Sequence, residues 1–184
     1  MTYKEFYSES ISNPENFWKK QAQNIKWFSE PTKILSDNEN GYPEWFADGE
    51  LNACYLCLDK HIEDGFGDEI ALIYDSPVTQ QIKKFTYNEV KSEVAKLAGG
   101  LKSLGVEKGD TVIIYMPMIS KAVFAMLACA RIGAIHSVVF GGFAPTELAT
   151  RIDDCKPKVI ITASSGIEID RLLAYKPFVD EAIE

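Results

Sequence analysis

Residues 110–163 read DTVIIYMPMISKAVFAMLACARIGAIHSVVFGGFAPTELATRIDDCKPKVIITA, and this stretch decides the fold. Three of its segments are rich in β-branched residues and nearly free of charge, as buried strands are: Thr111–Tyr115, Ile135–Phe140 and Lys158–Thr162. Helical patterns separate them. A strand–helix–strand–helix–strand order with short connections predicts right-handed crossovers and a parallel sheet. The predicted fold class is therefore α/β.

The two helical segments carry their own start and stop signals. Apolar and small residues cover nearly every face of Ile119–Ile132, so we expect this helix to be buried almost all round. Arg131 lies in its last turn, where a cation interacts favourably with the helix dipole, and Gly133 ends it. Pro145 preorganises the first turn of the second helix, and Glu147 follows near its positive end.

Phe140, Gly141, Gly142 and Phe143 leave the carboxyl end of the second strand, where parallel sheets bind ligands. Two glycines let a backbone approach a ligand closely, and the helix start beyond them offers amide donors to an anion. A turn that needs positive φ explains the same glycines equally well. Neither G-x-G-x-x-G nor G-x-x-x-x-G-K-[ST] occurs in the chain. The residues alone indicate a possible phosphate-approach loop.

The composition is that of an ordinary globular protein, with 46% hydrophobic and 25% charged residues. The net charge of −8 argues against nucleic acid and against an anionic membrane surface as partners. No apolar run reaches the ~20 residues that span a bilayer. The first ten residues resemble neither a signal peptide nor a transit peptide, so we expect a cytoplasmic protein.

Residues 1–65 are expected to form a helical N-terminal segment. Asn13, Pro14 and Glu15 mark a helix start, and apolar side chains follow at helical spacing: Trp18, Ala22 and Ile25. Residues 31–45 carry turn-forming residues and are interpreted as a connector. Residues 66–184 are assigned to a second region, which contains the parallel sheet. After Thr162 the chain is expected to continue as a loop, because Ser164, Ser165 and Gly166 follow one another.

The second region is predicted to begin with a β-hairpin and a helix. Residues 69–85 have the composition of two strands around a turn. Thr86 and Glu89 form a capping box, and the apolar face of the helix that follows runs from Val90 to Leu104. Gly99-Gly100 weakens this helix by about 1 kcal/mol per glycine, so we expect a neighbour to pack closely there.

Cys54, Cys57 and His61 have a spacing that metal and redox sites also show. However, Asn52 followed by ACYLCLDKHIEDG predicts a capped helix with Cys54 and Leu58 on one face. No second C-x-x-C occurs, and the strand–helix context of a thioredoxin-type motif is missing. We favour the structural helix and predict no metal site.

Two further groups of titratable residues are interpreted as structural. His136 lies inside a strand and is expected to be a hydrogen-bonded core residue, because no serine or cysteine nucleophile motif accompanies it. Asp153 and Asp154 are interpreted as a solvent-exposed helix face. We therefore predict no catalytic residue in this chain.

The run IYMPMISKAVFAMLACARIGAIHSVVFGGFAPTELATRIDDCKPKVIITAS resembles the early part of the AMP-forming acetyl- and propionyl-CoA synthetases, which belong to the acyl-adenylate-forming superfamily. The resemblance extends back through WFADGELNACYLCLDKH and forward to GIEIDRLLAYKPFVDEAI. IYDSPVTQQIKKFTYNEV and YKPFVDEAI resemble the propionyl branch more than the acetyl branch. The resemblance implies the N-terminal portion of such an enzyme, ending inside its large N-terminal domain.

The resemblance also implies an activity. The parent enzyme would join a short-chain carboxylate to ATP with the help of Mg²⁺, giving an acyl-adenylate and pyrophosphate. The thiol of CoA would then attack the mixed anhydride and release AMP. The motifs that bind the triphosphate, the ribose and the metal lie beyond this chain, so the segment itself is expected to be inactive.

What the resemblance assigns to this segment is part of a CoA-binding edge. The residues carried over are Phe140, Gly141, Gly142, Glu168, Ile169, Asp170 and Arg171. In the enzymes it resembles, a short basic stretch meets the phosphates of CoA. Here only Arg171 keeps the basic character, and Glu168 and Asp170 depart from the arginine- and glycine-rich form of the acetyl branch.

Two other classes stay open at this point. One is a free-standing CoA- or nucleotide-binding module of Rossmann-like topology. The other is a non-catalytic fragment that packs against a chain carrying the remainder of the enzyme. A sheet interrupted at this point exposes a strand edge and an apolar face, so self-association is also expected.

Overall fold

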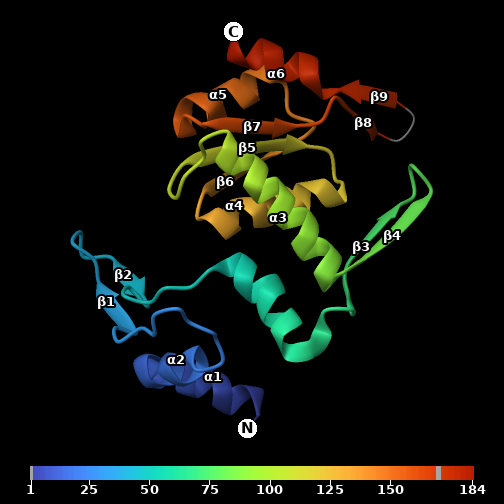
Figure 1. Ribbon diagram of the computed structural model, residues 1–184. Helices are drawn as coiled ribbons and strands as arrows, with labels where there is room; N and C mark the ends of the chain where they lie inside the picture. Colours follow the sequence, from blue (N-terminus) through green and yellow to red (C-terminus); the bar gives the residue numbers. More distant parts are fainter. Residues whose placement is uncertain (1, 169–170) are drawn as a thin grey trace. The chain divides into compact units, whose positions relative to one another are not determined.

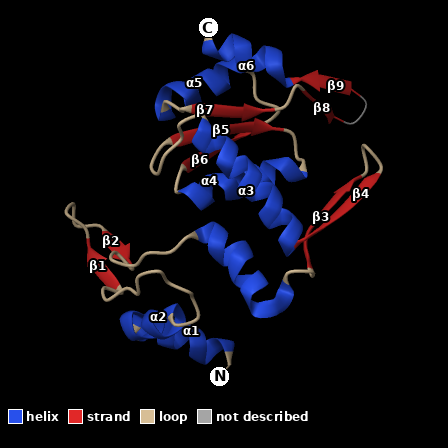
Figure 2. Ribbon diagram, viewed as in Figure 1, coloured by secondary structure: helices blue, strands red, loops and turns tan. Residues whose placement is uncertain are grey.

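The computed structural model describes residues 2–168 and 171–184 (Figures 1 and 2). The chain divides into two compact units, Met1–Asn52 and Ala53–Glu184. The helix that begins at Ala53 belongs to the second unit because it packs against α3 (Tyr87–Ser103). The sequence analysis placed a boundary between two family domains after residue 65. The compact units are defined by contacts within this chain, so the domain boundary stays a prediction.

The first unit pairs two helices with a small antiparallel ladder. Its elements are α1 (Tyr3–Ser12), α2 (Pro14–Ala22), β1 (Leu35–Asp37) and β2 (Pro43–Trp45). The predicted helix start is confirmed, but α2 ends before Ile25, and Phe17 rather than Trp18 is buried. Phe17 is buried because its ring packs edge-on against that of Phe6, with ring centroids 4.7 Å apart.

The segment interpreted as a connector is more ordered than its composition indicates. Within it β1 pairs with β2, and Asp48 then holds the start of the segment. The Asp48 carboxylate accepts hydrogen bonds from the Thr32 hydroxyl and from the backbone amides of Thr32 and Lys33. These bonds, led by that from the hydroxyl, lower the pKa of Asp48 to about 2.

The second unit begins with the helix predicted from Asn52 onward. Helical hydrogen bonding begins at residue 53 and includes two π-helical turns, Tyr55–Asp59 and Ile62–Phe66; Gly65, with φ of 93°, interrupts the helical backbone in the second turn. Cys54 and Leu58 face the core, with 0% and 3% of their surface exposed. The amphipathic interpretation of this segment is confirmed.

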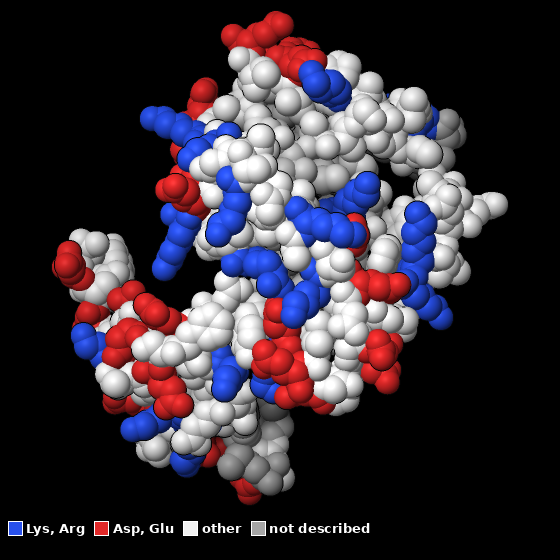
Figure 3. Space-filling model, viewed as in Figure 1, with Lys and Arg blue, Asp and Glu red and all other residues white. Residues whose placement is uncertain are grey.

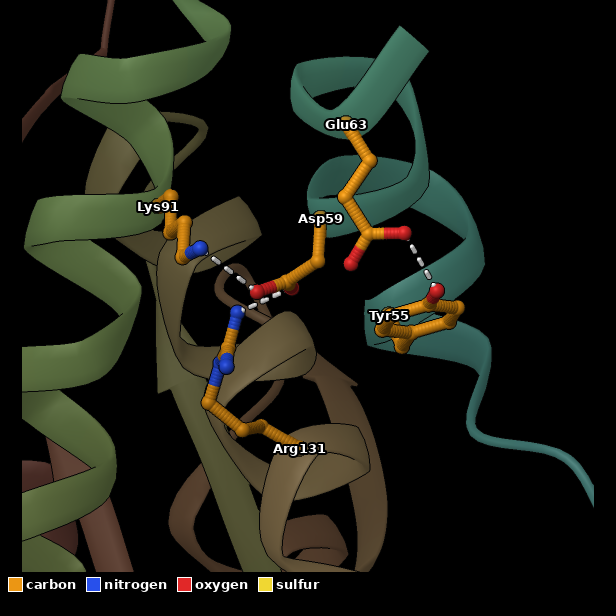
Figure 4. A network of polar contacts seen from close by, with 5 residues as sticks. All are labelled: Tyr55, Asp59, Glu63, Lys91 and Arg131. Atoms are coloured by element: carbon orange, nitrogen blue, oxygen red, sulfur yellow. Dashed lines mark hydrogen bonds and ion pairs between the residues drawn. The ribbon is translucent and has the colours of Figure 1, made fainter. Parts of the chain in front are cut away.

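Asp59 ties this helix to its two neighbours. Its carboxylate accepts a contact of 2.9 Å from Lys91 of α3 and one of 2.5 Å from Arg131 of α4 (Ser120–Ile132), as Figure 4 shows. Within the same helix, the Tyr55 hydroxyl donates to Glu63 at 2.7 Å. Burial raises the pKa of Asp59, but the hydrogen bonds from Lys91 and Arg131 outweigh burial and hold it below its ordinary value.

The predicted hairpin and helix are both present. β3 (Ile70–Ser76) pairs with β4 (Gln81–Thr86), and Thr86 and Glu89 form the capping box of α3. Two details differ. Leu104 ends the helix with 64% of its surface exposed. Gly99 and Gly100 are exposed, and a Cβ at either would meet no described atom within 4 Å, so the expected close packing is wrong.

The parallel sheet predicted from residues 110–163 is confirmed. Its strands are β5 (Thr111–Met116), β6 (Ile135–Phe140) and β7 (Val159–Thr162), connected by α4 and α5 (Pro145–Cys155). The spatial order is β6-β5-β7, so β5 lies in the centre and pairs in parallel with both others. The chain therefore moves to one side of β5 first and then crosses to the other.

Alternate side chains of β5 anchor two separate cores. Val112 packs with α3 and α4, whereas Ile113 and Tyr115 pack with α5 and with α6 (Tyr175–Ile183). Figure 1 shows the corresponding helices on opposite faces of the sheet. All four middle residues of β5 are at most 1% exposed, as the near-absence of charge in this strand predicted.

A second hairpin follows β7, where the sequence indicated a loop. β8 (Ser165–Glu168) pairs with β9 (Arg171–Ala174) in antiparallel register. Serine and glycine favoured a loop, but Gly166 is needed in this strand because an aromatic ring of α6 packs directly against it. The loop expectation is therefore wrong for residues 165–168.

β6 is an edge strand of the sheet among the residues that the structure describes. Its side chains Ile135, Val138 and Phe140 are 57%, 55% and 66% exposed. An open edge that carries apolar residues favours pairing with another chain, so the expected self-association stays a prediction. Within residues 2–168 and 171–184, no helix is both long enough and apolar enough to cross a membrane.

The Asp59 contacts give a first testable prediction. Asp59→Ala leaves two cations without their shared carboxylate, and we expect a loss of about 2 kcal/mol in the free energy of unfolding, less than for a fully buried pair. Urea titration at pH 7 measures it. Because the folded-state pKa lies below the ordinary value of 3.8, the contribution is present above that pH and is lost as the pH falls through the folded pKa.

Asp180→Ala is the matched control, since it removes an exposed partner of Lys176 one helical turn away. Such a pair contributes at most about 0.5 kcal/mol. Equal losses from the two variants would contradict a stabilising role for the Asp59 contacts.

Candidate functional site

A hollow of about 470 Å³ opens at the carboxyl ends of β5 and β6. We call it the β5–β6 hollow; it is lined by the end of β5 and residues 117–119, by the end of β6 and residues 141–142, by part of α4, and by Gly166, Ile167 and Tyr175. The chain leaves β5 toward α4 on one face of the sheet and leaves β6 toward α5 on the other. Adjacent strands with connections on opposite faces form the crevice in which α/β sheets bind ligands.

The predicted residues of the glycine turn, residues 140–143, lie at this crevice. Phe140 and Phe143 stack edge to face with ring centroids 5.6 Å apart. Gly141 and Gly142 line the β5–β6 hollow, and neither has positive φ. The alternative that these glycines serve a left-handed turn is therefore wrong, and close approach of another group is the remaining explanation.

Close approach is observed, and the approaching group is a side chain. A Cβ at Gly141 would lie 2.2 Å from the hydroxyl oxygen of Tyr175 and 2.7 Å from its Cε1. A Cβ at Gly166 would lie 2.8 Å from Cε2 of the same ring. Gly141 and Gly166 therefore make room for Tyr175, which is 3% exposed and begins α6, whereas a Cβ at Gly142 would meet the Phe140 ring.

A second tyrosine fixes the other end of the glycine turn. The Tyr115 hydroxyl donates a hydrogen bond of 2.8 Å to the carbonyl oxygen of Phe143. Its ring lies 5.1 Å from that of Tyr175, centroid to centroid. Sequence reasoning missed the role of both tyrosines. Only the packing of α6 against the sheet brings Tyr175 to the glycines and to the Tyr115 ring.

Of the remaining predicted residues, Glu168 ends β8 and Arg171 begins β9. Arg171 is exposed, with its backbone in register with Glu168. Ile169 and Asp170 lie outside the described residues. The structure brings Gly166 and Ile167 to the glycine turn, whereas Arg171 lies outside the lining of the hollow.

A second hollow of about 480 Å³ adjoins the first, and both share residues 117–119, Gly166 and Ile167 as walls. It extends to the β3–β4 turn, where Ser76 and Thr79 add hydroxyl groups. The Thr79 hydroxyl oxygen is buried and has no hydrogen-bond partner among the described residues. Together the two hollows form an elongated groove, apolar near β6 and more polar near the β3–β4 turn.

Arg151 is a cation that lies against the glycine turn. The Arg151 guanidinium lies 4.9 Å from the Phe143 ring centroid and also pairs with Glu147 at 3.2 Å. On the face drawn in Figure 3, acidic side chains lie among the basic ones. A phosphate at this edge would therefore depend on individual donors, because the whole chain carries a net charge of −8.

The cysteines and histidines lie away from this groove. Burial raises the pKa of the Cys54 thiol, and Cys57 is exposed. No group of three or more His, Cys, Asp or Glu residues in residues 2–168 and 171–184 could hold a metal ion. His136 is exposed on the edge strand β6, so its assignment to the core is wrong. Asp153 and Asp154 are exposed, as predicted.

Comparison with known proteins agrees with this architecture. A family model described as AMP-binding enzyme matches residues 60–182, more than half of the chain. A second model, described as acetyl-coenzyme A synthetase N-terminus, matches residues 3–57. The chain belongs to the AMP-binding enzyme family. The resemblance to the acetyl- and propionyl-CoA synthetases is confirmed at the level of the family, and a preference for the propionyl branch stays a prediction.

Several relatives of this AMP-binding enzyme segment are similar along its whole length. An uncharacterized protein of Pseudomonas aeruginosa is 56% identical over 184 residues, which is 100% of this chain and 29% of the relative. The mitochondrial acyl-CoA synthetase short-chain family member 3 of Bos taurus is 56% identical over 181 residues, 98% of this chain and 26% of its own. The acetyl-coenzyme A synthetase of Shewanella frigidimarina is 50% identical over 184 residues, 98% and 28% of the two chains. The chain thus spans less than a third of these relatives.

The geometry around Cys54 and Cys57 generates a second prediction. Replacing both with Ser should leave the zinc content of purified protein at zero and the thiol reactivity low, since the helix packs through Cys54 and Leu58. Metal analysis of protein prepared without chelators checks it, with the wild type as the reference. Stoichiometric zinc in the wild type that the double variant loses would contradict the packing interpretation.

Proposed function

We propose that this chain is the N-terminal part of an ATP-dependent, AMP-forming short-chain acyl-CoA synthetase. The observation that carries the proposal is the glycine turn at the crevice between β5 and β6, beside the hairpin that bears Arg171. This arrangement occurs in a chain of the AMP-binding enzyme family. The segment would contribute part of the CoA-binding edge.

The reaction proceeds in two steps in this proposal. A carboxylate oxygen of propionate or acetate attacks the α-phosphorus of ATP, and pyrophosphate leaves. The sulfur of CoA then attacks the acyl carbonyl, AMP leaves with the electron pair of the acyl–oxygen bond, and the thiol proton passes to solvent. Neither step is assigned to a residue of this chain.

The residues at the edge fit a phosphate-bearing ligand with a long neutral arm. Arg171 presents an exposed guanidinium, which binds phosphate through charge-assisted hydrogen bonds. The two adjoining hollows are mainly apolar, and the Ser76 and Thr79 hydroxyl groups line the one nearer the β3–β4 turn. CoA combines these features, with phosphates at one end and an extended thiol arm at the other.

The cellular location and the assembly are part of the proposal. The enzyme is proposed to be cytoplasmic. The open edge of β6 is expected to meet the remainder of the same enzyme, or another copy when the segment stands alone. Small molecules are the proposed partners, without nucleic acid or membrane.

The isolated 184-residue chain should be inactive. We expect no propionate- or acetate-dependent exchange of pyrophosphate into ATP, because no residue assigned to this segment binds the triphosphate. Calorimetric titration with CoA accompanies the exchange assay. Acid-dependent exchange would contradict the proposal, and tight CoA binding without exchange would favour a free-standing CoA-binding module.

Arg171→Ala tests the CoA-binding edge in the complete synthetase. Loss of a charge-assisted bond worth about 1.5–3 kcal/mol should raise the KM for CoA roughly tenfold to hundredfold. Pyrophosphate exchange should stay near the wild-type rate, because adenylation precedes CoA binding. Stopped assays of both half-reactions measure the difference.

Two variants make this test specific. Arg171→Lys keeps the charge without the fork of donors and should give an intermediate KM. Lys102→Ala removes an exposed cation from α3 and should leave the KM unchanged. An unaltered KM in Arg171→Ala, or an equal fall in both half-reactions, would show that Arg171 is a surface or structural residue.

A further inference from the structure

We infer that Tyr175 is the positioning residue of this site: its ring sets the spacing between the glycine turn and the β8–β9 hairpin. The inference rests on the proposed function, because it concerns the same CoA-binding edge. Tyr175 touches no reacting atom in this role. It acts through the backbone of Gly141 and Gly166.

The two edges of the ring meet two different backbones. Gly141 lies against the hydroxyl and Cε1 edge, and Gly166 lies against the Cε2 edge. Gly141 follows β6 on one side of the hollow, whereas Gly166 belongs to β8 on the other. The width of a phenol ring therefore determines how far apart the turn and the hairpin stand.

The ring itself is held from two directions. The backbone N–H of Tyr175 donates to the carbonyl oxygen of Ser164 at 3.1 Å, which ties the start of α6 to the hairpin. The Tyr115 ring packs at 5.1 Å, and the hydroxyl of that tyrosine holds Phe143 at the far end of the turn. A buried ring with these supports has little freedom, so its position is transmitted to both glycines.

The consequence concerns the geometry of a bound phosphate. Gly142 presents its backbone at the hollow, and Arg171 is carried by the strand that pairs with Gly166 and its neighbours. A phosphate that contacts both needs the two segments at one fixed separation. Without the ring this separation is no longer fixed, although Gly142 and Arg171 are both still present.

The experiment compares variants at residue 175 in the complete synthetase. Misplacement of binding groups by an ångström costs up to about a hundredfold, so Tyr175→Ala should raise the KM for CoA about tenfold or more. The rise should exceed any fall in the pyrophosphate-exchange rate by at least about the same factor. Tyr175→Phe keeps the ring and should restore a near-wild-type KM.

Phe178→Ala is the matched control, because it removes an aromatic ring from the same helix and the same core. It should lower the melting temperature without the selective rise in the KM for CoA. An equal rise in both variants would overturn the inference, since general loosening of the core would then explain the effect. No change in Tyr175→Ala would overturn it as well.

A double-variant cycle separates the two explanations of Gly141. Gly141→Ala alone should impair CoA use, because its methyl group would collide with the Tyr175 ring. If the glycine serves the ring, Gly141→Ala combined with Tyr175→Ala should be no worse than Tyr175→Ala alone. Fully additive losses would show that the glycine serves the ligand directly, and would overturn the positioning role.

Failure of the proposed function gives a different result. If thioester formation by the wild-type synthetase does not saturate with CoA, the proposed CoA site is contradicted, and the inference about Tyr175 fails with it. If the wild type saturates and Arg171→Ala raises the KM, the function holds. The residue-175 variants then decide the positioning role by themselves.

Discussion

Burial of β5 on both faces is the constraint on which the rest of the second unit depends. A strand that hides its side chains on two sides needs a helical layer on each, and the chain supplies α3 and α4 for one and α5 and α6 for the other. Hydrophobic burial of this kind contributes about 25 cal/mol per Å² of apolar surface. The central place of β5 also explains why the connections from β5 and β6 depart in opposite directions.

The candidate site results from the opposite directions in which the chain leaves β5 and β6. Two strands whose connections separate leave a gap at their carboxyl ends, the place where α/β sheets generally bind ligands. The glycine turn, Gly166 and Tyr175 then shape this gap. The same interlocking that stabilises the fold therefore sets the dimensions of the site.

Sequence patterns were sufficient for the elements that have a clear period. The strands of the parallel sheet, the capping box at Thr86 and the helix around Cys54 were all predicted, because each depends on local spacing. The exposure of His136 was not, since it follows from the place of β6 at the sheet edge. The role of Tyr175 was missed for a similar reason, because its contacts join segments that are distant along the chain.

The position of Tyr175 along the chain also matters during synthesis of the protein. Chains emerge from the ribosome with the N-terminal part first, and domains begin to fold as they appear. All three strands of the sheet leave the ribosome before the residue that separates the glycine turn from the hairpin. During synthesis the unit therefore lacks the spacer of its proposed ligand edge until the first turn of α6 has emerged.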